Sequence, residues 1–174
     1  YYRLKIYMRA FEKPDGKFVD GTTFQEIVDV YNFDRRLRLI LSDAIERIEV
    51  SLRAQIVNVM GLIGSPHFYY DEDYFDQKTS IATIRKIGEQ SNHLSIKHYK
   101  QQYHKPYLPP IWCLTEASTF GQLSTIFADL KREYRKEIAR EYGLDESVCV
   151  SWFRSLSALR NICAHHGRLW NADL

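Results

Sequence analysis

The chain of 174 residues is 45% hydrophobic and 26% charged, the composition of an ordinary globular protein that is long enough for one well-buried core. Its formal net charge of +2 is too small to indicate nucleic-acid binding by itself, so a phosphate-binding surface would have to come from local clustering. Three widely spaced cysteines without a CxxC pair argue against a disulfide framework or a zinc ribbon, and no apolar run reaches the length of a membrane span. We therefore expect a cytoplasmic protein without a metal, a cofactor or a membrane partner. Because the chain begins with Tyr1 rather than Met, we also expect residues to be missing from its ends.

The first sixty residues predict an arm followed by helix. A cluster of turn signals predicts a short irregular or stranded arm over residues 1–22. These signals are Pro14, Asp15-Gly16 and Asp20-Gly21. The segment from Thr23 to Glu26 has the pattern of a capping box and predicts the start of a short helix. A much longer helix is expected from Asn32, as its N-cap, to Gly61.

This long helix is amphipathic, because its apolar residues recur at steps of three and four. They are Phe33, Leu37, Ile40, Leu41, Ala44, Ile45, Ile48, Leu52, Ile56 and Val59. The other face carries the charged residues Arg35, Arg38, Glu46, Glu49 and Arg53. We expect that face to be solvated, with Glu49 and Arg53 spaced for an ion pair four residues apart.

The remaining sequence also predicts helices. Residues 77–104 favour two helical pieces with a polar break between them, and residues 111–130 favour a helix interrupted at Gly121. A further helix ends at Gly143, and the last runs from about Glu146 to Gly167. The chain is therefore expected to be all-α, with six or so helices in a single domain over residues 1–174.

The last helix carries the stretch RNICAHHGRLW, residues 160–170. In a regular helix one stripe of roughly 80° forms the core side. That stripe contains Val148, Trp152, Leu156, Leu159 and Cys163. His166 returns to the stripe, which predicts a buried or half-buried histidine with a structural hydrogen bond. Asn161 and His165 face the opposite side, so His165 is the better candidate for an accessible proton carrier. Arg160 lies about 140° of helical turn from His165, so one undistorted helix does not easily direct both at a single phosphate.

Two explanations follow from this angle: the helix is distorted near its end, or two copies of the chain assemble the site. RNA cleavage by internal attack needs a base for the 2′-OH proton and an acid for the leaving 5′ oxygen. It also needs positive charge where the pentavalent phosphate develops. Two copies of Arg160 and His165 across a twofold axis would meet these needs without a metal, and Asn161 would hold the imidazole or contact the phosphate. The alternative is a core helix that happens to carry histidines, because this spacing is common.

The segment LRNICAHHGRLWN, residues 159–171, resembles the signature of the Abi-like proteins of the AbiD/AbiF type, which are bacterial abortive-infection proteins within the wider HEPN superfamily. Residues 21–56 resemble the N-terminal helical block of that family, and LPPIWCLTEASTFGQLS, residues 108–124, resembles its middle motif. YYRL at the start is similar to the entry motif of the family, cut short. These ordered matches along one chain are together far more specific than the motif alone.

The resemblance implies a HEPN-like helical bundle that forms a homodimer through the motif helices. It implies a metal-independent endoribonuclease that leaves a cyclic phosphate, acts in phage defence and has Arg160, Asn161 and His165 as its catalytic residues. It also implies control by a regulatory RNA or by an antitoxin-like protein or RNA. The alternative is a non-catalytic RNA- or protein-binding HEPN module, for example one half of a toxin–antitoxin assembly, because some HEPN proteins have lost catalysis.

Other residues are candidates for supporting roles. Besides His166, Glu116 is a candidate because it lies in the polar part of an apolar helix, where it would pair with Arg160 or Arg53. An RNA-binding role is predicted for Arg168 and for a basic, aromatic strip, because aromatic rings stack on bases while cations meet phosphates. The strip includes His98, Tyr99, Lys100, Tyr103 and Lys105. An ordinary surface helix remains the alternative for this strip.

Overall fold

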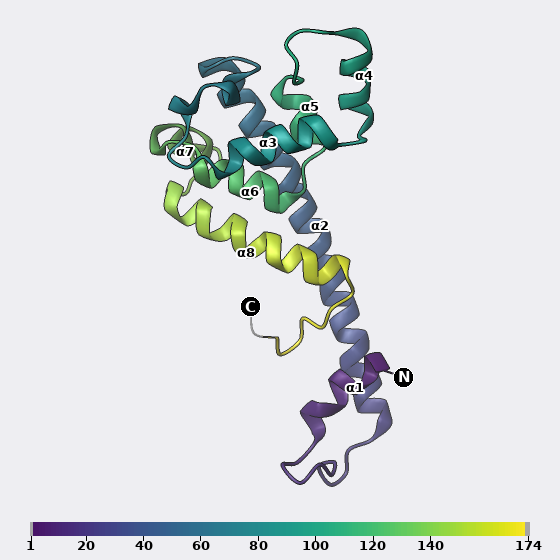
Figure 1. The fold of residues 1–174 in the computed structure, drawn as a ribbon. Coiled ribbons are helices and arrows are strands. Elements are labelled where there is room, and N and C mark those ends of the chain that lie inside the picture. The colour runs from purple at the N-terminus through teal and green to yellow at the C-terminus, as the bar shows by residue number, and fades with distance from the viewer. Residues whose placement is uncertain (1, 173–174) are drawn as a thin grey trace. The chain divides into compact units, whose positions relative to one another are not determined.

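The structure, a computed structural model, describes residues 2–172 and consists of helices joined by loops (Figure 1). Eight α-helices lie in this described range: α1 (Tyr2–Met8), α2 (Phe24–Ile63), α3 (Thr79–Gln90), α4 (Leu94–Gln102), α5 (Ile111–Glu116), α6 (Phe120–Asp129), α7 (Arg132–Arg140) and α8 (Glu146–Ala164). Three short 3-10 helices accompany them: η1 (Arg9–Phe11), η2 (Phe68–Tyr70) and η3 (Glu72–Tyr74). The described residues form two isolated β-bridges but no strand, so the predicted all-α class is confirmed.

The chain divides into two compact units. The first, called the terminal unit here, comprises residues up to Ile45 and residues from Leu159 onward. The second, called the central unit, comprises Glu46–Ala158. The boundaries fall inside α2 and α8, so each of these helices contributes residues to both units. Within residues 2–172, no helix combines the length and the apolar composition needed to cross a lipid bilayer.

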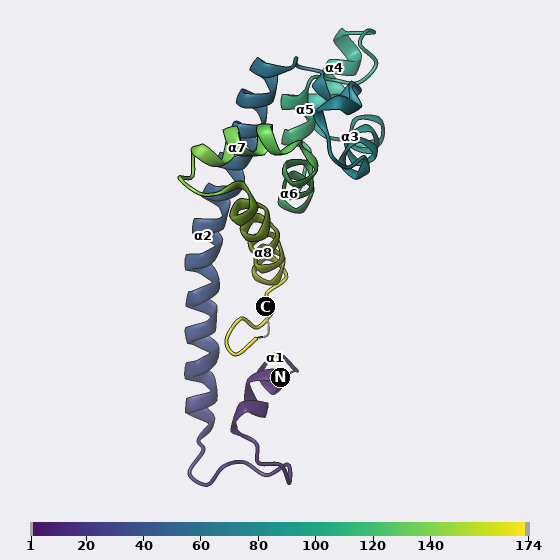
Figure 2. The same ribbon diagram turned by 90° about the vertical axis from the view of Figure 1, so that its left-hand side faces the viewer.

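The arm of the terminal unit is helical before it becomes irregular. Helix α1 lies beside the N-terminal part of α2 (Figures 1 and 2). The connection between them has the predicted irregular form, with a single antiparallel bridge between Glu12 and Phe18. Gly16 and Gly21 have φ angles of 80° and 85°, a left-handed conformation that glycine adopts without steric cost. The prediction of an irregular arm thus holds for the connection, while the residues before it fold as a helix.

Helix α2 is one continuous helix of 40 residues. The predicted capping box is present at its start: the Thr23 amide donates to Glu26 Oε2 at 2.7 Å, and the Glu26 amide donates to Thr23 Oγ1 at 3.3 Å. The prediction of a separate helix capped by Asn32 is wrong. The capping box already starts the helix, and no proline or glycine follows it before Gly61, so nothing interrupts the turn at Asn32.

The core of the central unit is apolar and is built around the second half of α2. Leu52, Ile56 and Met60 are fully buried there, and each such side chain contributes about 1.5–3 kcal/mol relative to exposure. Helix α3 packs on α6, and α4 packs on α5. The predicted break between two helical pieces is confirmed by the gap between α3 and α4. The next break precedes Gly121 rather than falling on it, because Thr119 forms a capping box with Gln122 and starts α6.

Candidate functional site

The candidate motif lies at the C-terminal end of α8, which stops at Ala164. The His166 amide donates to the Cys163 carbonyl at 3.0 Å, and the Gly167 amide donates to the Ile162 carbonyl at 2.7 Å. This pair of bonds is a Schellman cap, in which one residue takes a left-handed conformation. That residue is His166, with φ 55°. A Cβ on Gly167 would lie 2.9 Å from Ile162 Cγ2, so this close approach requires glycine.

The position of the cap determines which side chains of the motif are exposed and which are buried. Asn161 and His165 are exposed, as their side of the helix predicts, and the His165 amide donates to the Asn161 carbonyl at 3.0 Å. Cys163 is buried at 6% exposure, as predicted, and burial raises the pKa of its thiol. Arg160 is half-buried. The prediction of a buried His166 is wrong: the helix ends before this residue, so the extrapolated stripe no longer applies, and His166 is exposed.

Another stripe position on α8, Trp152, also differs from the prediction, while Val148, Leu156 and Leu159 are half-buried. Trp152 is 57% exposed, while Phe153 is 4% exposed and Cys149 is 1% exposed. The buried side of the helix is therefore rotated by about one residue from the predicted one, toward Cys149 and Phe153. The helical angle places Trp152 on the predicted core stripe, but it is Phe153 that is buried, and it packs edge to face on Phe127 with ring centroids 5.1 Å apart.

The segment after the cap is held by a buried polar cluster, defined by Tyr7, Asp34 and Arg38. Asp34 is fully buried and accepts hydrogen bonds from the Tyr7 hydroxyl and from Arg38 Nη1, with which it forms an ion pair. Its Oδ1 accepts from the amides of Leu169 at 3.0 Å and Trp170 at 2.7 Å. Arg38 Nη1 also donates to the carbonyl of Gly167 at 3.1 Å. The cluster thus fixes the backbone that follows His166 against α1 and α2.

The charges of this cluster balance each other. Burial lowers the pKa of Arg38, but the hydrogen bond to Tyr7 and the charge of Asp34 outweigh it, so the pKa is raised overall and the guanidinium stays charged. Burial raises the pKa of Tyr7, and its hydrogen bond to Asp34 adds to this effect. A buried charge is tolerated when it is paired and hydrogen-bonded in this way.

Sequence reasoning missed this cluster. The prediction that Arg38 lies on a solvated face is wrong, since only 7% of it is exposed. The same prediction holds for Arg35 and Glu46, which are exposed. Asp34 was not singled out at all. The available signal was the spacing of Asp34 and Arg38, four residues apart, which suits an ion pair within a helix.

The remaining candidates lie at several places. His98, Lys100, Tyr103 and Lys105 are exposed in the central unit, as the basic strip predicts. Tyr99 is not available to a base: it is 8% exposed, and its hydroxyl donates to the Pro106 carbonyl at 2.9 Å.

Glu116 and Arg168 each have a defined contact. Of the two partners predicted for Glu116, the described ion pair is with Arg53, at 3.9 Å, and Arg53 also meets Glu49 at 3.4 Å. Arg168 is half-exposed and donates to the carbonyl of Ile6 at 3.4 Å, which ties the tail to α1. Within the described residues, no group of three or more His, Cys, Asp or Glu side chains is arranged to hold a metal ion.

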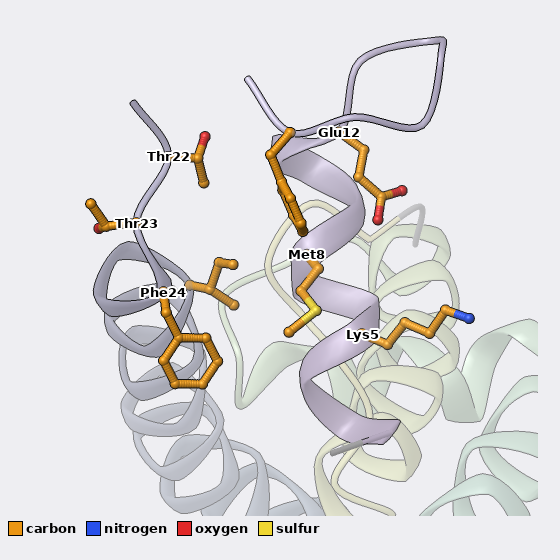
Figure 3. Close-up of a pocket in the computed structure, with 8 residues that line it drawn as sticks. Lys5, Met8, Glu12, Thr22, Thr23 and Phe24 are labelled. Carbon is orange, nitrogen blue, oxygen red and sulfur yellow. The ribbon is translucent and has the colours of Figure 1, made fainter. Parts of the chain in front are cut away.

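A pocket of about 590 Å³ in the terminal unit opens between α1 and the start of α2 (Figure 3). Met8 is directed toward the helix that carries Phe24, while Lys5 and Glu12 extend on the other side of α1. The predicted site residues do not line this pocket, so it is separate from the motif.

The family comparison agrees with the resemblance of the motif segments. The family model described as Abi-like protein matches residues 1–171, which include both α2 and the motif of α8. No curated protein and no solved structure matched the chain. At the level of the family, the match indicates a role in abortive infection, a defence of bacteria against phage. Because the match spans nearly its whole length, the chain belongs to the Abi-like protein family.

Proposed function

We propose that this protein is a metal-independent endoribonuclease of the HEPN type that acts in phage defence as a homodimer. His165 is its acid or base, Arg160 stabilises the charge on the phosphate, and Asn161 supports them. The observation that supports this proposal most is the placement of Asn161, His165 and His166. All three are exposed at a helix end whose backbone is fixed by a Schellman cap and by the buried polar cluster.

The proposed reaction uses the 2′-OH of RNA as its nucleophile. One imidazole takes the 2′-OH proton while the oxygen attacks the adjacent phosphorus, and a second imidazole donates a proton to the departing 5′ oxygen. The products are a 2′,3′-cyclic phosphate and a 5′-OH end. Imidazole suits both steps because it exchanges protons near neutral pH. A guanidinium stabilises the extra negative charge of the pentavalent phosphate.

A second copy of the chain would supply the second imidazole. Exposed apolar side chains on α2 support such an assembly, because apolar surface left in solvent is characteristic of protein interfaces. In the terminal unit, Phe33 is 55% exposed and Ile40 is 69% exposed. Both belong to the apolar stripe that predicts the core side of this helix. A second copy of the chain would cover these apolar side chains, which are exposed to solvent in a single copy.

The test is cleavage of labelled single-stranded RNA by the purified protein in the presence of EDTA. We expect cleavage with 2′,3′-cyclic phosphate ends, and we expect His165→Ala and Arg160→Ala to reduce its rate by at least about 100-fold. Arg154→Ala is the matched control, because Arg154 is an exposed arginine on the same helix outside the motif. Intact RNA after incubation with the wild-type dimer, or full activity of the His165 variant, would contradict the proposal.

A second candidate function is RNA binding without cleavage. The exposed strip formed by His98, Lys100, Tyr103 and Lys105 favours it, because that surface offers cations and an aromatic ring to a single strand. Under this alternative the wild type and His165→Ala bind RNA equally well and leave it whole. Lys100→Ala and Tyr103→Ala would then weaken the binding.

A further inference from the structure

A basic pocket of about 420 Å³ lies beside the motif in the terminal unit. It is defined by Arg3 of α1, by Tyr31, Arg35, Arg38 and Ser42 of α2, and by His166. All of these residues belong to the same compact unit. The pocket therefore brings three arginines from two helices next to the residue that follows His165.

The charge of this pocket is not balanced by its own lining. None of the described side chains that line it is a carboxylate. Arg38 is neutralised by Asp34 in the buried polar cluster. Within residues 2–172, neither Arg3 nor Arg35 forms an ion pair, and both are exposed. Two guanidinium groups thus face a common space with their charge uncompensated, which is the arrangement that attracts an anion.

The remaining lining fits a phosphodiester better than a simple ion. Guanidinium groups bind phosphate through two parallel hydrogen bonds, and the hydroxyls of Tyr31 and Ser42 are further hydrogen-bonding groups. The volume of about 420 Å³ lies in the range of small-molecule sites and exceeds the space that a phosphate alone requires. The side chain of Leu39, also in the lining, offers an apolar surface to a sugar or base.

We propose that this pocket binds a phosphate of the RNA strand adjacent to the phosphate that is cleaved, with Arg3 and Arg35 as its ligands. The proposal rests on the proposed ribonuclease function. His166 lines the pocket and directly follows His165, so a strand held here passes the candidate acid or base. Arg3 and Arg35 are then positioning residues that set the register of the strand, while Arg38 keeps its structural role.

The test measures the affinity of a fluorescent single-stranded RNA for the full chain in the His165→Ala background, at several salt concentrations. We expect Arg3→Gln and Arg35→Gln each to weaken binding by about 3–10-fold, and each to reduce the slope of log K against log salt by about 0.7. Arg36→Gln is the matched control. It removes the same charge from an exposed neighbour on α2 that does not line the pocket, and we expect less than a twofold change.

Three outcomes overturn the inference. Equal losses for Arg36→Gln and Arg35→Gln would mean that general surface charge, not the pocket, binds the strand. Unchanged affinity in the Arg3 and Arg35 variants, with melting temperatures like that of the parent, would show that the pocket is unused. In a competition experiment, inorganic phosphate or adenosine monophosphate is added to the complex with RNA. Displacement of the RNA by either compound at micromolar concentrations would mean that the pocket is a small-molecule site.

The two proposals fail in different ways. If the wild type does not cleave RNA but binding still depends on Arg3 and Arg35, the nuclease proposal falls and the phosphate site remains as part of a binding module. If the wild type cleaves RNA while the pocket variants bind and cleave normally, only the phosphate site falls.

Discussion

Both halves of α2 bury apolar side chains, but only the half in the terminal unit also buries an ion pair, although one apolar periodicity runs through both. In the central unit the buried positions of α2 are Leu52 and Ile56, as the periodicity predicts, and Met60, which lies outside the predicted stripe. In the terminal unit the buried positions include Asp34 and Arg38, while the apolar Phe33 and Ile40 are exposed. Periodicity identifies the apolar face of a helix but not what covers it. Where the chain itself covers a different face, apolar side chains such as Phe33 and Ile40 stay exposed.

The largest loss of stability is expected when the ion pair between Asp34 and Arg38 is broken. Asp34→Asn leaves the Arg38 guanidinium buried without its counter-charge, which costs about 3–5 kcal/mol of the free energy of unfolding. Denaturant titration measures this loss. Asp29→Asn is the matched control, because Asp29 is an exposed carboxylate on the same helix, and its change should stay within about 0.5 kcal/mol.

The double variant Asp34→Asn/Arg38→Met tests whether the unpaired charge of Arg38 causes this loss. Replacing both charges removes the unpaired cation, so we expect it to be more stable than Asp34→Asn alone. A loss in Asp34→Asn no greater than that of the Asp29 control would show that the cluster does not support the terminal unit.

The second largest loss of stability is expected in the part of α2 that belongs to the central unit. Leu52→Ala leaves a cavity in the core of the central unit and should reduce the free energy of unfolding by about 3 kcal/mol. Leu62→Ala is the matched control, since Leu62 is 87% exposed and lies in the last turn of α2. Its effect should be below about 0.5 kcal/mol in the same denaturant titration. Similar losses in the two leucine variants would contradict the burial pattern.

The third prediction concerns the apolar face that the terminal unit leaves exposed. Ile40→Ser should leave the stability of the monomer nearly unchanged but weaken the proposed dimer by about 10-fold or more, because it removes apolar area from the interface. Sedimentation velocity over a concentration series measures this shift. Leu94→Ser is the control, because Leu94 is 80% exposed but lies on α4. A wild-type chain that stays monomeric at all concentrations would refute both the proposed dimer and the role of the exposed apolar residues of α2 as its interface.

The features that local sequence could predict are those that depend on neighbouring residues. The all-α class, the Thr23–Glu26 capping box and the break between α3 and α4 belong to this group, because propensity and capping act over a few residues. The buried polar cluster could not be predicted in the same way. Asp34 is buried because it accepts the amides of Leu169 and Trp170, which lie more than 130 residues away in the chain. The exposure of His166 was missed for a related reason: the extrapolation assumed a regular helix, whereas the tail held by Asp34 and Arg38 leaves α8 at Ala164.

The smallest expected effect lies at the cap of α8. His166 has a φ angle of 55°, a conformation that costs a residue with a Cβ about 1 kcal/mol and glycine almost nothing. His166→Gly should therefore stabilise the protein by about 0.5 kcal/mol after the greater flexibility of glycine in the unfolded chain is counted, which raises the melting temperature by roughly 1–2 °C. His165→Gly is the matched control: its φ angle is not positive, so the same substitution one residue earlier should destabilise the helix end. A lower melting temperature for His166→Gly would mean that the imidazole stabilises the cap by more than its backbone strain costs. RNA cleavage by the stabilised variant would also show whether His166 takes part in the chemistry or only terminates the helix that presents His165.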